Sequence, residues 1–163
     1  MRRCRAALTL VVAAAAMVLL ACGDDDRPEP ATGPRTVSQE EIDNASGDPD
    51  RAVLEWWRDV QFQNAAGALE RYAPDVDLTV EELNRQLSIA RSSFVGVPRI
   101  VDVRRSGDIA TIYMTLLPPG STAAERNLSL NLEEIDGEWL LRDNLLMTEA
   151  VARVARAQAA TED

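Results

Sequence analysis

The hydrophobic pattern of this chain changes its period once, near Gly96, and this change limits the folds that the chain can adopt. Before Gly96 the apolar residues recur at helical spacing, as Val53, Trp56 and Trp57 do. After Gly96 apolar and polar residues alternate, as in residues 128–132, which is typical of strands. The sequence therefore predicts an α+β fold in which amino-terminal helices pack on a curved antiparallel sheet of about four strands, plus a carboxy-terminal helix.

Capping signals mark where the first helices begin. Ser38 and Glu41 form a capping box before a short helix, and Gly47 is expected to end that helix in the left-handed conformation. Asp48 precedes Pro49, so we expect the Asp48 side chain to cap a second helix. This second helix would bury both tryptophans of its apolar face.

Three further helix starts follow the same logic. Asn64 is expected to cap a short helix through Ala73, and Thr79 a longer helix, with Glu82 completing a second capping box. Thr148 is expected to cap the last helix. The apolar face of this last helix would carry Val151, Val154 and Ala155. Acids at such helix starts are expected to be solvated and ionised.

Turn residues divide the segment between these helices into strands. Val101 and Val103 alternate with polar residues, and residues 109–117 are apolar on both faces, as a central strand would be. Asp136 and Gly137 form a dipeptide that is typical of a two-residue hairpin turn. Because such short turns join antiparallel neighbours, we expect an antiparallel sheet.

The composition excludes several classes of chemistry. All 17 cationic residues are arginine and the chain contains no histidine, so no side chain has an ordinary pKa near neutrality and the commonest zinc ligand is missing. The net charge of -10 opposes binding to nucleic acid. We therefore predict no catalytic residue, no metal site, no cofactor and no nucleic-acid partner.

The amino terminus is typical of an export signal. Three arginines within residues 2–5 precede an uncharged run over residues 6–20, which is shorter than the roughly 20 residues of a membrane-spanning helix. The run closes with Leu-Leu-Ala-Cys at residues 19–22, and this segment resembles the lipobox of bacterial lipoproteins. In that family the cysteine receives a lipid and a peptidase cleaves before it, so the resemblance implies lipidation of Cys22 and a membrane partner through this anchor. The alternative is an ordinary secretory signal that happens to end near a cysteine.

The predicted chain has three parts. Residues 1–21 are a lipoprotein signal peptide, residues 22–47 are the lipidated cysteine with a flexible acidic and proline-rich tether and a short helix, and residues 48–161 are the folded domain. Cleavage would remove three arginines and no acid, so the net charge would change from -10 to -13. We expect the mature protein to be extracytoplasmic and anchored to the bacterial cell membrane.

Two segments and the order of the elements resemble a known fold family. An aromatic-rich helix segment lies at residues 52–57, and residues 136–139 read Asp-Gly-Glu-Trp in the last hairpin. Over residues 48–143 this order is similar to the cone-shaped domains of the nuclear-transport-factor-two-like family, and in particular to small bacterial lipoproteins of unknown function. The resemblance implies a cone that is either hollow or filled by side chains. A helix after Leu146 departs from the simplest version of that fold.

Aromatic residues are the candidates for a pocket or for packing. They are Trp56, Trp57, Phe62, Tyr72, Tyr113 and Trp139. The tryptophans would either line a cavity for a small apolar ligand or fill the space between helix and sheet, and packing is the commoner outcome. Phe62 lies away from the buried helix face, which makes it a candidate for a contact surface.

Two functions remain open. The first is an extracytoplasmic lipoprotein whose domain binds a small apolar ligand or an envelope protein without catalysis. The second follows from the resemblance, because ketosteroid isomerase shares the cone and pairs a carboxylate base with a tyrosine. Here Asp102 or Glu133 would have to meet Tyr72 or Tyr113. We favour the first function, because we expect both tyrosines to be half-buried packing residues and both acids to lie on the wet face of the sheet, and one fold hosts many functions.

Overall fold

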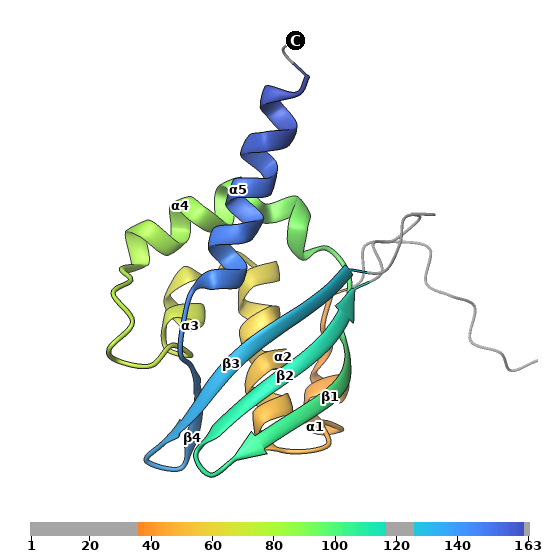
Figure 1. The fold of residues 1–163 in the computed structure, drawn as a ribbon, viewed down its shortest axis with the longest axis vertical. Coiled ribbons are helices and arrows are strands. Elements are labelled where there is room, and N and C mark those ends of the chain that lie inside the picture. The colour runs from red at the N-terminus through yellow and green to blue at the C-terminus, as the bar shows by residue number, and fades with distance from the viewer. Residues whose placement is uncertain (1–35, 117–125, 162–163) are drawn as a thin grey trace, which may run out of the picture. The chain divides into compact units, whose positions relative to one another are not determined.

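The computed structural model describes residues 36–116 and 126–161. The chain divides into two compact units, residues 1–30 and 31–163, and all the described residues belong to the second. In chain order its elements are α1 (Gln39–Asp43), α2 (Asp48–Gln61), α3 (Ala65–Leu69), α4 (Val80–Ala90), the 3₁₀ helix η1 (Arg91–Phe94), β1 (Arg99–Ser106), β2 (Ile109–Leu116), β3 (Arg126–Ile135), β4 (Glu138–Leu141) and α5 (Leu145–Ala159) (Figure 1).

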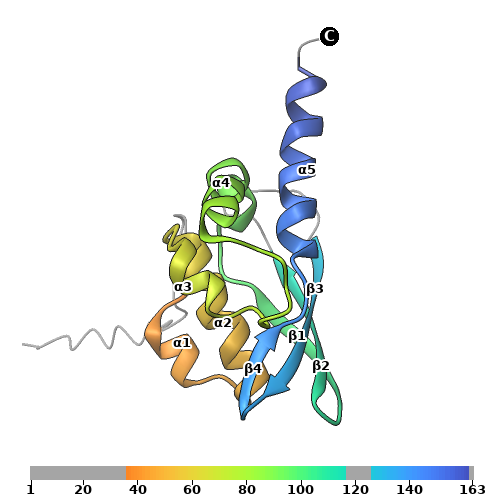
Figure 2. The ribbon, with the colours of Figure 1, turned by 90° about the vertical axis from the view of Figure 1, so that its left-hand side faces the viewer.

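The strands form one antiparallel sheet in the order β1-β2-β3-β4. Figure 2 shows α1, α2 and α3 on one side of this sheet. Along β2 alternate residues are buried beneath the helices, because successive side chains of a strand point to opposite faces. The sheet is curved and does not close, and the predicted α+β class is confirmed.

The core lies between α2 and the sheet, as the helical spacing predicted. Val53, Trp56 and Trp57 are fully buried on α2, and Ile112 and Leu132 meet them from the sheet side of the same core. Burial of large apolar side chains contributes roughly 1.5 to 3 kcal/mol each to folding. The packing of this face therefore holds α2 against the strands.

Two short turns join strands of the sheet, and the one predicted at Asp136 and Gly137 is confirmed. Gly107 joins β1 to β2 with a φ of 65°, and Asp136 and Gly137 join β3 to β4 with φ values of 54° and 87°. Left-handed backbone at both central residues is the hairpin conformation that Asp-Gly favours. The strand predicted around Val101 and Val103 also forms, although it lies at the open edge of the sheet and both valines are exposed.

The structure corrects the boundary between the first two helices. The backbone amides of Asn44 and Ala45 already bind the last carbonyls of α1, at 3.0 and 3.2 Å, so α1 ends before Gly47 is reached. Gly47 has extended backbone and precedes α2 as its N-cap. Asp48 is therefore the first residue inside α2, and its side chain makes no capping hydrogen bond.

The predicted caps at Asn64 and Thr79 are confirmed, but the helix after Asn64 is shorter than expected. Asn64 accepts from the amide of Gly67 at 3.2 Å, and α3 then ends at Leu69 instead of Ala73. The reason is a competing pairing, because the backbone of Arg71 and Ala73 binds the amide and carbonyl of Leu141 at 2.8 Å each. This pairing covers the outer edge of β4.

The second predicted capping box is incomplete. Thr79 accepts from the amide of Glu82 at 3.2 Å, as expected. The Glu82 carboxylate instead binds Arg85 and Gln86 one turn further along α4. These partners lie close on the helix surface, since residues three and four apart are neighbours.

The last helix begins earlier than predicted. Its first residue is Leu145, whose amide donates to the Asp143 carboxylate at 3.1 Å, so Thr148 is an internal residue and not a cap. The residues that enter the core are Leu146, Met147 and Ala150. Val151 and Val154 are only half-buried and Ala155 is exposed, because the core meets only the first turns of α5. In neither described range is there a helix with the length and apolar character that a membrane crossing requires.

Candidate functional site

The interior between α2 and the sheet is filled by aromatic rings. Trp56 packs edge-on against Trp57, Tyr72 and Phe94, with ring centroids 6.0 to 6.3 Å apart. The rings of Trp57 and Phe94 are 5.2 Å apart. A cavity of about 10 Å³ remains beside Trp57, which is space for one water molecule at most. These aromatic residues therefore pack the core and line no ligand cavity there.

The other aromatic candidates lie in different places. Trp139 is buried in the same core, with the Arg105 guanidinium 4.7 Å from its ring centre. Phe62 is 65% exposed at the end of α2, so it is available for a contact surface. Tyr113 is half-buried on the sheet face that points away from α2, and Arg104 lies 4.8 Å from its ring centre.

The acids of the isomerase hypothesis do not meet a tyrosine in an apolar cavity. Asp102 is paired with Tyr113 in the sheet, but its carboxylate binds Arg104 at 3.0 Å and is exposed. Glu133 binds Arg142 at 3.2 Å. The hydroxyl of Tyr72 donates to Asn144 at 2.9 Å instead of meeting an acid.

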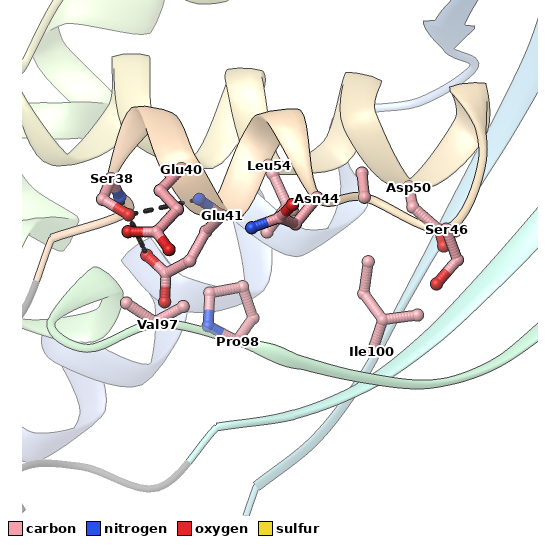
Figure 3. Close-up of a pocket in the computed structure, with 11 residues that line it drawn as sticks. Ser38, Glu40, Glu41, Asn44, Ser46, Asp50, Leu54, Val97, Pro98 and Ile100 are labelled. Atoms are coloured by element: carbon pink, nitrogen blue, oxygen red, sulfur yellow. Dashed lines mark hydrogen bonds between the residues drawn. The ribbon is translucent and has the colours of Figure 1, made fainter. Parts of the chain in front are cut away.

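A groove of about 460 Å³ lies outside the core, between α1 and the segment that leads into β1. We call it the α1 groove. Its lining residues are Ser38, Glu40, Glu41, Asn44, Ala45, Ser46, Asp50, Leu54, Val97, Pro98 and Ile100 (Figure 3). Its size lies within the usual range of small-molecule sites.

The local sequence explains how the α1 groove forms. The capping box at Ser38 starts α1, and buried Val37 and Ile42 fix this short helix to the core. Because α1 has only one turn, the chain reverses into α2 close by, and the first turn of α2 then borders the groove. Val97 and Pro98 form the opposite side in extended backbone before β1.

The α1 groove is acidic. Among its lining residues are three acids and no arginine. The Glu41 carboxylate binds the backbone amide and hydroxyl of Ser38 at 2.8 and 3.0 Å, whereas Glu40 is exposed. Asp50 is only 6% exposed, and burial raises the pKa of its carboxyl above the ordinary value of 3.8.

The burial of Asp50 contradicts the expectation that acids at helix starts are solvated. It lies in the first turn of α2, where an acid is common because it stabilises the helix terminus. The local sequence therefore explains the presence of an acid at position 50 by its place in the helix, and it does not indicate a binding site there. Ile100 borders the same groove although it is 50 residues away in the sequence, and no local pattern indicates this.

The signal peptide, Cys22 and the tether up to residue 35 lie outside the described residues. Over residues 36–116 and 126–161, no three acidic or sulfur side chains are grouped as a metal site would need.

Comparison of the sequence with models of known protein families and with curated proteins found no match. Solved structures similar to this chain include an NTF2-like protein of unknown function from Shewanella oneidensis, with 12% identity, a TM-score of 0.43, and coverage of 59% of this chain and 93% of the other. A protein of unknown function with a cystatin-like fold from Nostoc punctiforme has 14% identity and a TM-score of 0.46, and the match covers 67% of this chain and 91% of the other. An NTF2-like protein of unknown function from Pseudomonas putida has 13% identity and a TM-score of 0.39, and the match covers 57% of this chain and 78% of the other. Similarities at these TM-scores say nothing about function or about site residues.

Proposed function

We propose that this protein is a bacterial extracytoplasmic lipoprotein, anchored to the cell membrane through a lipid on Cys22, whose domain binds a ligand or partner without catalysing a reaction. The Leu-Leu-Ala-Cys segment at residues 19–22, after a positive and then an apolar run, supports the anchor. An anchor of two or more acyl chains is sufficient for stable membrane attachment without basic residues.

The packed aromatic interior is the observation that carries the non-catalytic role, because it leaves no room for an active site inside the domain. An isomerase of that kind would need an apolar cavity around an acid and a tyrosine, whereas Trp56, Trp57 and Phe94 pack against one another in the interior. The α1 groove instead provides a concave surface that is open to small molecules. Binding at a surface groove is therefore favoured over chemistry in the interior.

The anchor is tested by expressing the full chain in a bacterium and separating membranes from soluble protein. The mature protein is expected in the membrane fraction, and mass spectrometry should find an amino-terminal peptide that begins at a lipid-modified Cys22. Cys22→Ala should give an uncleaved precursor or a released protein. Cys4→Ala is the matched control, because Cys4 leaves with the signal and should not matter. A native protein that is soluble with an unmodified Cys22 would overturn the proposal.

The non-catalytic role is tested by assaying the same purified protein with steroid enones and short hydroxy-acyl substrates. No turnover is expected, because the Asp102 carboxylate is exposed and held by Arg104. Turnover that is lost in Asp102→Asn or in Tyr113→Phe would contradict this role and favour the isomerase function.

A further inference from the structure

Negative charge lies at two separate places along the α1 groove. Figure 3 shows Glu40 and Glu41 toward one end of the groove, with Asp50 and Ser46 toward the other. Because the acids do not converge on one point, they do not form a site for a single metal ion, which needs several oxygen ligands within about 2.6 Å of the ion.

The side of the groove between these acids is apolar. Val97, Pro98 and Ile100 lie along it, and Leu54 contributes from α2 (Figure 3). Arg99, which lies between Pro98 and Ile100 in the sequence, places its guanidinium at the hydroxyl of Thr115 instead, 3.4 Å away. The groove thus combines an apolar wall with acids near its two ends.

The Asp50 side chain is mostly buried at the groove and, within the described residues, has no hydrogen bond or ion pair that would compensate this burial. Burial raises the pKa of its carboxyl. The other charged groups among the lining residues are Glu40 and Glu41, so the lining supplies no positive charge. A buried charge is costly unless it is paired, so a cation in the groove would offset this cost.

We propose that the α1 groove binds a linear alkyl diamine, with one ammonium group at Asp50, the second near Glu40, and the methylene chain along Val97, Pro98 and Ile100. This proposal rests on the proposed binding role and names its ligand class. The two ammonium groups would place positive charge at Asp50 and Glu40, and each ammonium has three hydrogen-bond donors for carboxylate oxygens. The methylene chain provides apolar surface for the wall of the groove.

The test is calorimetric titration of the full-length lipoprotein in detergent with diamines from 1,4-diaminobutane to 1,8-diaminooctane. Affinity is expected to peak at one chain length, because the spacing of the acids is set by the fold. Two matched probes separate charge from apolar contact. 1-Aminohexane should bind more weakly than 1,6-diaminohexane, and 1,6-hexanediol should not bind measurably.

Variants then locate the site. Asp50→Asn should lower the affinity for the tightest-binding diamine by at least about tenfold, as expected for loss of a buried charge partner. Asp48→Asn is the control, because Asp48 lies in the same first turn but is exposed and does not line the groove. Glu40→Gln, at an exposed position, should reduce the difference between diamine and monoamine and serves as a second variant.

Three results would overturn the diamine proposal: no diamine binds, the diol binds as tightly as the diamine, or Asp48→Asn weakens binding as much as Asp50→Asn. The last result would mean general attraction of cations to an acidic protein. None of these results affects membrane anchoring at Cys22, so failure of the ligand class and failure of the lipoprotein proposal are distinguishable.

Discussion

Trp57 donates a hydrogen bond from its indole Nε1 to the carbonyl oxygen of Gly96, 3.0 Å away. Gln61, one turn later on α2, donates to the same oxygen at 2.8 Å. Gly96 has a φ of 101°, which glycine adopts readily and other residues rarely do. These bonds attach α2 to the chain just before β1, at the point where the hydrophobic period changes.

Trp57→Ala is expected to lower the free energy of unfolding by about 3 to 5 kcal/mol, because it removes a fully buried ring and the bond to Gly96. Urea denaturation measures this change. Phe62→Ala is the control, since its ring is exposed and its loss should change stability by under about 0.5 kcal/mol. A cost under about 1 kcal/mol at Trp57 would mean that its ring does not fill the core.

Tyr72→Phe is expected to lower the free energy of unfolding by about 1 to 2 kcal/mol. The Tyr72 hydroxyl donates to Asn144 at 2.9 Å, and Asn144 donates to Gln86 at 2.7 Å, so the change leaves a part-buried amide oxygen without its donor. Burial raises the pKa of Tyr72 well above its ordinary value of 10.0. Tyr72→Phe should therefore leave the ultraviolet titration near pH 10 unchanged, and a lost signal there would contradict the buried hydroxyl.

Asp50→Asn is expected to stabilise the protein at neutral pH. Because burial raises the pKa of Asp50 in the folded state, that state binds a proton at higher pH than the unfolded chain does, and stability falls as pH rises through the raised pKa. The gain should shrink as the pH falls below the ordinary value of 3.8.

Denaturation curves at a series of pH values, without diamine, test this dependence. Asp48→Asn removes a charge from the same helix turn at an exposed position, so it controls for the interaction with the helix terminus. A gain at Asp48 equal to that at Asp50, or a gain at Asp50 that does not vary with pH, would refute the role of burial.

Arg153→Gln is expected to stabilise the fold by a few tenths of a kcal/mol, a typical size for a partly exposed pair of like charges. Arg153 and Arg126 line the same small cavity, and burial together with the charge of Arg153 lowers the pKa of Arg126. The gain should fall with added salt, which screens the repulsion. Arg156→Gln, one turn nearer the end of α5 and exposed, should give no such gain. Thermal unfolding at low and high salt compares the two.

The order of helices and strands was predictable because it depends on local periodicity. The spacing of Val53, Trp56 and Trp57 identified the buried face of α2, and Asp136-Gly137 identified the last hairpin turn. In both cases neighbouring residues alone determine the preferred conformation. Helix ends were predicted less well, since the Arg71–Ala73 segment leaves the helix to pair with Leu141, 68 or more residues away in the chain.

The class of fold, the aromatic face of α2, the last hairpin turn and the absence of histidine chemistry could be predicted from the residues alone. Each of these follows from residue type or from short-range spacing. Three other features depend on the three-dimensional packing: the aromatic rings fill the interior, Tyr113 and Asp102 lie on the outer sheet face, and Asp50 is buried at the α1 groove. Burial depends on which distant segments meet, and Asp50 and Ile100 border the same groove although they are 50 residues apart in the sequence.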